Sequence, residues 1–97
     1  MTRLSDDEVR AALAEGLPGW ELRDGTITKA FGFSGFRTAI DFIDRVADEA
    51  QAARHHPDLQ NRYNRVDVTL TTHDEGGVTA KDIALARAIE AVADTEV

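Results

Sequence analysis

Residues 54–73 read RHHPDLQNRYNRVDVTLTTH, and this stretch predicts a β-hairpin. From Val66 to Leu70 the apolar residues alternate with Asp67 and Thr69. Such alternation is typical of a strand with one face on the core and the other face in solvent. The hairpin therefore belongs to a sheet that is covered on one side only.

The turn of this hairpin decides which residues face each other. A two-residue turn at Tyr63-Asn64 pairs a short polar strand, 58–62, with the strand that contains Val66. Residue 58 then faces residue 69, and the same register continued backwards places 56 opposite 71 and 54 opposite 73. His55 and His56 thus return beside His73, and the three histidines of the chain form one cluster.

The surrounding segments complete an α+β domain that we expect to span 1–97. Ser5 and Glu8 have the spacing of a helix capping box, and so do Thr79 and Asp82. We expect a two-layer fold with three helices on one face of a four-stranded antiparallel sheet, in the order α-β-β-α-β-β-α. The expected elements are helix 6–15, strands 20–22 and 26–33, helix 35–53, strands 58–62 and 66–70, and helix 80–93.

Two of these helices have informative apolar patterns. The last helix is apolar almost all round, which predicts cover on more than one side and is a sign of a homodimer or homotetramer. The helix over 35–53 is expected to be the centre of the core, with one continuous stripe. Its expected members are Phe36, Ala39, Ile40, Ile43, Val46, Ala47 and Ala50.

Composition excludes several classes of function. The chain has 18 acidic and 11 basic side chains, for a net charge of −7, and no cysteine. The negative charge disfavours nucleic acids and anionic membranes as partners, and without cysteine there is no thiolate nucleophile or cysteine-based metal site. No long apolar run or signal-peptide pattern is present, so we expect a cytoplasmic protein.

The histidines have structural as well as functional explanations. His55 follows a helix, whose dipole stabilises a cation at that end, and His73 fits an ordinary exposed position. A metal site is weakly indicated, because His55 and His56 are adjacent and a further ligand has to come from Asp74, Asp82 or water.

Acid–base chemistry without a metal is the alternative. Imidazoles titrate near neutral pH, so histidines around one pocket can give a proton to a leaving group and take one elsewhere. Thr72 provides a neighbouring hydroxyl but has no triad role, so nucleophilic catalysis is not supported.

A motif from Gln51 to Asp82 resembles the signature of the pterin-4a-carbinolamine dehydratases. It begins with Gln51-x-x-x-His55-His56-Pro57; Tyr63 follows after five residues, His73 after nine more and Asp82 after a further eight. The element order matches the family fold as well. The resemblance implies dehydration of 4a-hydroxytetrahydrobiopterin, or a related bacterial pterin, to the quinonoid dihydropterin and water, as part of pterin recycling.

The resemblance also implies roles for particular residues. His55, His56 and His73 surround the pterin, protonate the departing 4a-hydroxyl and remove the N5 proton, with acid and base unassigned. Asp82 has two explanations, either its capping box with Thr79 alone or a dual role that also orients a histidine or Lys81. No metal or cofactor is expected. The implied substrate-binding or supporting residues are Gln51, Arg54, Pro57, Asp58, Lys81 and Asp82.

Two positions depart from the family pattern. Gln51 stands where a carboxylate is usual, which removes a negative charge and, by expectation, a proton acceptor beside the histidines. Leu59 replaces a common aromatic residue. An alternative function is therefore a non-catalytic binding or assembly module of the same fold, such as a dimerisation partner or chaperone-like protein.

Overall fold

The computed structural model describes residues 2–96 and has the expected order of elements. No helix in the described range is both long enough and apolar enough to cross a membrane. The elements are α1 (Asp6–Ala14), β1 (Glu21–Arg23), β2 (Thr26–Gly32), α2 (Phe36–Ala53), β3 (Asp58–Arg62), β4 (Arg65–Leu70), the 3₁₀ turn η1 (His73–Glu75) and α3 (Ala80–Glu96).

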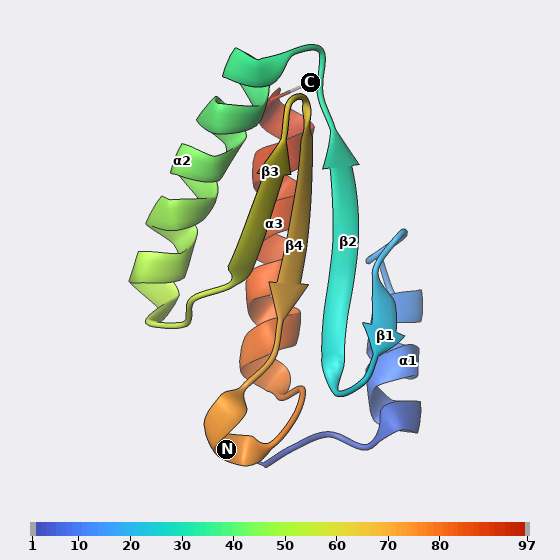
Figure 1. Cartoon of the computed structure of the whole chain (residues 1–97). Coiled ribbons are helices and arrows are strands. Elements are labelled where there is room, and N and C mark those ends of the chain that lie inside the picture. Colours follow the sequence, from blue (N-terminus) through green and yellow to red (C-terminus); the bar gives the residue numbers. More distant parts are fainter. Residues whose placement is uncertain (1, 97) are drawn as a thin grey trace.

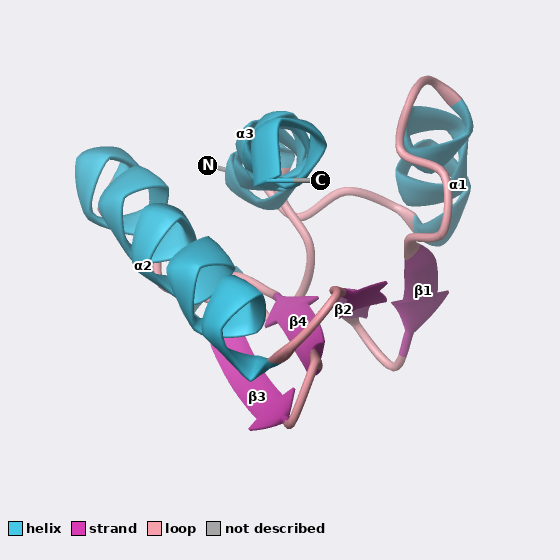
Figure 2. Ribbon diagram, turned by 90° about the horizontal axis from the view of Figure 1, so that it is seen from above, coloured by secondary structure: helices cyan, strands magenta, loops and turns pink. Residues whose placement is uncertain are grey.

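The four strands form one antiparallel sheet in the order β1-β2-β4-β3. Its central pairing joins the two hairpins, with Ile27 opposite Leu70 and Phe31 opposite Val66. All three helices lie on one face of this sheet, and α3 runs between α1 and α2 (Figure 2). The α+β class and the one-sided sheet are therefore confirmed.

The register of the second hairpin agrees with the prediction within the strands but not beyond them. Asp58 faces Thr69 as expected, and the pairing ends there. The expected pairs 56–71 and 54–73 do not form, because the chain turns at the end of α2 instead. Arg54 has a φ of 53°, and the backbone N–H of His55 donates to the carbonyl of Ala50 at 3.1 Å. This is the hydrogen-bond pattern of a Schellman motif.

The core stripe of α2 is shifted by comparison with the expected one. Phe42 is fully buried, and its ring contacts those of Phe31 and Phe33 with centroids 4.9 and 4.8 Å apart. Phe36, by contrast, is 51% exposed. The buried positions of α2 are Ala39, Phe42, Val46 and Ala50, so the expected continuous stripe divides into a core stripe and a neighbouring outer stripe.

The apolar residues of α3 are largely covered within the chain. Ile83, Leu85 and Ile89 are buried, and Ala88 and Val92 pack against the core. The cover comes from the sheet below and the helices on either side (Figure 2). The monomer fold therefore accounts for most of the apolar pattern of α3, while Ala84 and Ala91 remain exposed. Among the described residues, the large apolar side chains that remain exposed are Phe36, Leu59 and Tyr63.

A half-buried polar cluster fastens α3 to the sheet. Lys29 of β2 donates from Nζ to Glu90 Oε1 at 2.5 Å and to the carbonyl of Pro18 at 2.8 Å. The indole N–H of Trp20 donates to the same Glu90 oxygen at 2.8 Å. The side chains of Lys29 and Glu90 are both only 18% exposed. Glu90 is thus the shared acceptor of two donors that lie away from bulk water.

Replacing Glu90 by alanine should leave the Lys29 ammonium and the Trp20 N–H without their acceptor. We expect a loss of about 2–3 kcal/mol in the free energy of unfolding, measured by urea denaturation. The matched control is Glu21→Ala, which removes only the exposed ion pair with Arg23 and should cost less than about 0.5 kcal/mol. Equal losses in the two variants would contradict the structural role given to Glu90.

Candidate active site

The three histidines meet in a pocket of about 300 Å³ at one end of the sheet. The end of α2, the chain beyond β4 and the start of α3 come together there, at the lower end of the molecule in Figure 1. The cluster expected from the hairpin is therefore present, although loops rather than paired strands close it. The pocket is lined by Arg54, His55, His56, Thr71, Thr72, His73, Asp74 and Lys81.

His55 is held by a buried carboxylate. Its Nε2 contacts Asp82 Oδ1 as hydrogen-bond partner and ion pair, and the two side chains are 11% and 0% exposed. Because a carboxylate oxygen only accepts, Nε2 carries the proton of this hydrogen bond. The neutral ring then has its lone pair on Nδ1. Asp82 thus fixes both the position and the tautomer of His55, in the manner of a carboxylate that orients a catalytic imidazole.

Asp82 also caps the N-terminus of α3, as predicted from its capping-box spacing with Thr79. The backbone N–H of Thr79 donates to Asp82 Oδ2 at 2.9 Å, and the Thr79 hydroxyl accepts from the N–H of Lys81 at 3.2 Å. Asp82 therefore contacts both the first residues of α3 and a histidine. Lys81 contributes only its backbone to this cap.

Thr72 is a further partner of Asp82 that the sequence interpretation missed. Its hydroxyl donates to Asp82 Oδ2 at 2.8 Å, and the side chain is buried. The signal was present in the alternation of β4, because Thr72 continues the inward series Val66, Val68 and Leu70. The sequence interpretation considered Thr72 only as a nucleophile.

His56 is held more loosely, by Gln51. Its Nε2 lies 3.2 Å from Gln51 Oε1, and both side chains are exposed. Gln51 therefore still offers an acceptor oxygen to the histidine. An amide oxygen accepts this hydrogen bond but, unlike a carboxylate, is not a base, so the expected loss of a proton acceptor is not contradicted. What the glutamine lacks is the negative charge.

His73 begins the short turn η1 and is exposed. The two ends of its loop are closed by backbone bonds between Thr72 and Gly77, at 2.9 Å from the Thr72 N–H and 3.3 Å from the Gly77 N–H. The histidine is thus placed by its loop. It follows directly on Thr72, which contacts the carboxylate behind His55.

Two cations flank the histidines. Arg54 and Lys81 both line the pocket and are exposed. Arg54 occupies the left-handed position of the Schellman motif, with φ 53°, where glycine is usual. In a chain with a net charge of −7, these side chains bring two positive charges to a pocket that Asp74 also lines.

Pro57 and Asp58 do not line the pocket. Asp58 is exposed at the start of β3, opposite Thr69. Pro57 lies between His56 and the strand. Within residues 2–96, no three histidine, aspartate or glutamate side chains are grouped so that they could hold a metal ion.

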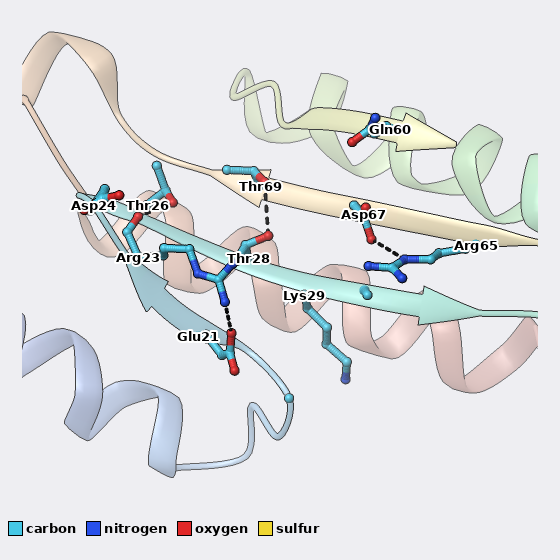
Figure 3. Close-up of a pocket in the computed structure, with 12 residues that line it drawn as sticks. Glu21, Arg23, Asp24, Thr26, Thr28, Lys29, Gln60, Arg65, Asp67 and Thr69 are labelled. Atoms are coloured by element: carbon cyan, nitrogen blue, oxygen red, sulfur yellow. Dashed lines mark hydrogen bonds and ion pairs between the residues drawn. The ribbon is translucent and has the colours of Figure 1, made fainter. Parts of the chain in front are cut away.

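A larger hollow of about 650 Å³ lies on the open face of the sheet (Figure 3). Its charged and hydroxyl groups are largely paired with each other, as Glu21 with Arg23, Arg65 with Asp67, and Thr28 with Thr69. Such pairs leave few groups free for a ligand. The smaller histidine pocket is therefore the better candidate for chemistry.

Comparison with known proteins assigns the chain to a family. Residues 2–92 match the family model described as pterin 4 alpha carbinolamine dehydratase. A relative from Thermomicrobium roseum, provisionally named pterin-4-alpha-carbinolamine dehydratase, is 48% identical over 96% of this chain and 99% of its own length. A Rhodospirillum rubrum relative with the same name is 50% identical over 93% of this chain and 95% of its own.

Two solved structures resemble this chain. The crystal structure of a transcriptional coactivator/pterin dehydratase from Brucella melitensis has a TM-score of 0.90 and 46% identity, and covers 95% of this chain and 99% of its own. A pterin dehydratase-like RuBisCO assembly factor of the alpha-carboxysome has a TM-score of 0.65 and 20% identity over 76% of this chain and 86% of its own, which is a likeness of fold alone. The chain belongs to the pterin 4 alpha carbinolamine dehydratase family.

Proposed function

We propose that the protein is a hydro-lyase that dehydrates a pterin 4a-carbinolamine, such as 4a-hydroxytetrahydrobiopterin, in the histidine pocket. The observation that carries this proposal is the convergence of all three histidines on one pocket, with a buried carboxylate behind one of them. Membership of the dehydratase family supports the same reaction.

The reaction needs two proton transfers and little else. The bond from C4a to the hydroxyl oxygen breaks as that oxygen receives a proton, and water leaves. The N5–H bond gives its proton to a base, and its electrons form the new double bond between N5 and C4a. Histidines suit both transfers at neutral pH.

In this mechanism Asp82 assists the transfer that leaves His55 positively charged. With its Nε2–H directed to Asp82, the neutral His55 exchanges a proton with the substrate through Nδ1. A fixed carboxylate stabilises the imidazolium that forms. His56 and His73 are the remaining proton carriers, and both lie on the exposed side of the pocket.

Arg54 and Lys81 are proposed to bind the polar edge of the pterin. The pyrimidine half of a pterin carries a carbonyl oxygen and ring nitrogens, which accept hydrogen bonds from guanidinium and ammonium groups. Both cations line the pocket beside the histidines. Pro57 and Asp58 support the site only through the chain that joins His56 to β3.

The proton-transfer role of the histidines predicts that His55→Ala and His73→Ala each slow dehydration by about 10²- to 10⁴-fold. The rate is followed spectroscopically with purified protein and a freshly generated carbinolamine. The control is Arg62→Ala, at an exposed position on β3 that does not line the pocket, and it should keep the wild-type rate. A dehydration rate with wild-type protein no higher than the rate in buffer would contradict the proposal.

A non-catalytic binding or assembly module is the second candidate. Gln51 in place of a charged partner for His56 favours it, and so do the exposed side chains of Phe36, Leu59 and Tyr63. Titration calorimetry with a stable pterin separates the two candidates. A folded protein without pterin binding and without a rate above buffer is the result that the module predicts.

We also propose that the protein forms a homo-oligomer, without choosing between dimer and tetramer. β3 is an edge strand whose five residues are all exposed, and an unpaired edge is a template for another strand. Exposed Leu59 lies on this strand, and Tyr63 follows it directly. A second copy would cover both side chains.

Restoring a carboxylate at position 51 should make the enzyme faster. In Gln51→Glu the hydrogen bond from His56 becomes charge-assisted, and we expect a gain of about fivefold in the dehydration rate, equivalent to about 1 kcal/mol. Gln51→Met, which removes the acceptor at similar size, should be slower than wild type. An unchanged rate in Gln51→Glu would show that the missing charge is tolerated.

A further inference from the structure

Behind His55 lies a buried chain of hydroxyl groups that the proposed reaction does not itself use. The Thr72 side chain is 9% exposed, and Thr79 and Asp82 are fully buried. The Thr72 hydroxyl lies 2.8 Å from Asp82 Oδ2 and 2.9 Å from the Thr79 hydroxyl. The contact with the carboxylate is made by Asp82 Oδ2, whereas His55 is bound by the other oxygen, Oδ1.

The direction of each hydrogen bond in this chain follows from counting protons. The Asp82 carboxylate only accepts, so the single hydroxyl proton of Thr72 is used on Oδ2. The bond between the two hydroxyls must then run from Thr79 to Thr72. The Thr79 oxygen in turn accepts from the N–H of Lys81. In this arrangement the hydroxyls of Thr72 and Thr79 each have a donor and an acceptor partner. Asp82 Oδ2 accepts from Thr72 and Thr79, and Asp82 Oδ1 accepts from His55.

Thr72 also acts through its backbone. Its carbonyl accepts from the N–H of Glu75 at 3.0 Å and of Gly77 at 3.3 Å, and its own N–H donates to the carbonyl of Gly77 at 2.9 Å. These bonds close the loop that carries His73. One residue therefore contacts the carboxylate that holds His55 and anchors the loop that holds His73.

We propose that Thr72 is a positioning residue, whose hydroxyl fixes the Asp82 carboxylate and through it the tautomer and orientation of the His55 ring. The consequence for catalysis rests on the proposed dehydratase function. The effect on the His55 ring does not, because it is a property of the protein without substrate.

The tautomer of the His55 ring is measured by nuclear magnetic resonance on ¹⁵N-labelled protein. Two-bond ¹H–¹⁵N spectra distinguish the Nε2–H and Nδ1–H forms of each histidine. The three histidines are assigned with His56→Gln and His73→Gln. We expect His55 of the wild type to show a single Nε2–H form when neutral. Thr72→Val should show a mixture of both forms, because the Asp82 carboxylate is then held only by the Thr79 N–H and its Oδ1 turns away from His55 in part of the molecules. Thr72→Ser, which keeps the hydroxyl, should restore the wild-type spectrum.

The same variants are compared in steady-state dehydration. Thr72→Val should lower kcat by roughly 10- to 100-fold with little change in KM, because a poorly aligned histidine slows proton transfer without removing a substrate contact. Thr72→Ser should recover most of the rate. Thr69→Val is the matched control, since it removes a threonine pair on the open face of β4, the strand before Thr72, and it should leave both the spectrum and kcat unchanged.

The outcomes separate the two proposals. A single Nε2–H form of His55 in a folded Thr72→Val protein overturns the role of Thr72, whatever the wild-type activity. A wild-type protein without dehydratase activity overturns the proposed function, while the spectra still decide the role of Thr72. If Thr72→Val does not fold by circular dichroism, Thr72→Ala, which removes the same hydroxyl without placing a methyl group beside Asp82, is measured in its place.

Discussion

The arrangement of this molecule depends on the fully buried carboxylate of Asp82. A buried charge is costly unless donors surround it. Here the donors are the imidazole of His55, the hydroxyl of Thr72 and the backbone N–H of Thr79. They come from the chain after α2, the chain after β4 and the start of α3. The carboxylate is satisfied only when these three segments meet, so the folding of this region and the assembly of the pocket are one event.

The backbone conformation of the segment after α2 brings His55 to Asp82. The Schellman motif ends the helix at Ala53 and turns the chain, so His55 leaves the helix axis and reaches Asp82. Pro57 follows shortly afterwards and lacks the N–H that a continued helix would need. The hairpin β3–β4 then returns the chain to the same end of the sheet, where His73 completes the cluster. His56 and His73 are exposed there, so the pocket at this end is open to a substrate.

Much of the fold was predictable from local signals. The capping residues Ser5 and Thr79 and the alternation of β4 each indicate one kind of backbone, and each is found where expected. The histidine cluster was predictable in part, because the hairpin β3–β4 returns the chain to the end of α2; its strand pairing stops at Asp58 and Thr69, and loops bring the histidines together. Local patterns do not determine the rotation of α2, so Phe42 was missed from its core stripe.

The remaining misses have a common physical origin. Lys29 pairs with Glu90, and Thr72 with Asp82, and each pair joins residues on different elements whose individual patterns suggest an ordinary strand or helix position. The polar partner becomes visible only when packing places the second element over the first. For Gln51 the sequence indicated the missing charge, but only the structure shows that its amide oxygen still contacts His56.

The claim that Asp82 both caps α3 and sets the His55 ring is tested most directly by the dehydration rate of Asp82→Asn. The Thr79 N–H requires an oxygen at the Oδ2 position, so the asparagine must direct its NH₂ group to His55 and force the ring into the Nδ1–H form. The account predicts a folded protein with an intact cap, whose rate falls by about 10²- to 10⁴-fold. A folded Asp82→Asn protein with the wild-type rate would contradict it.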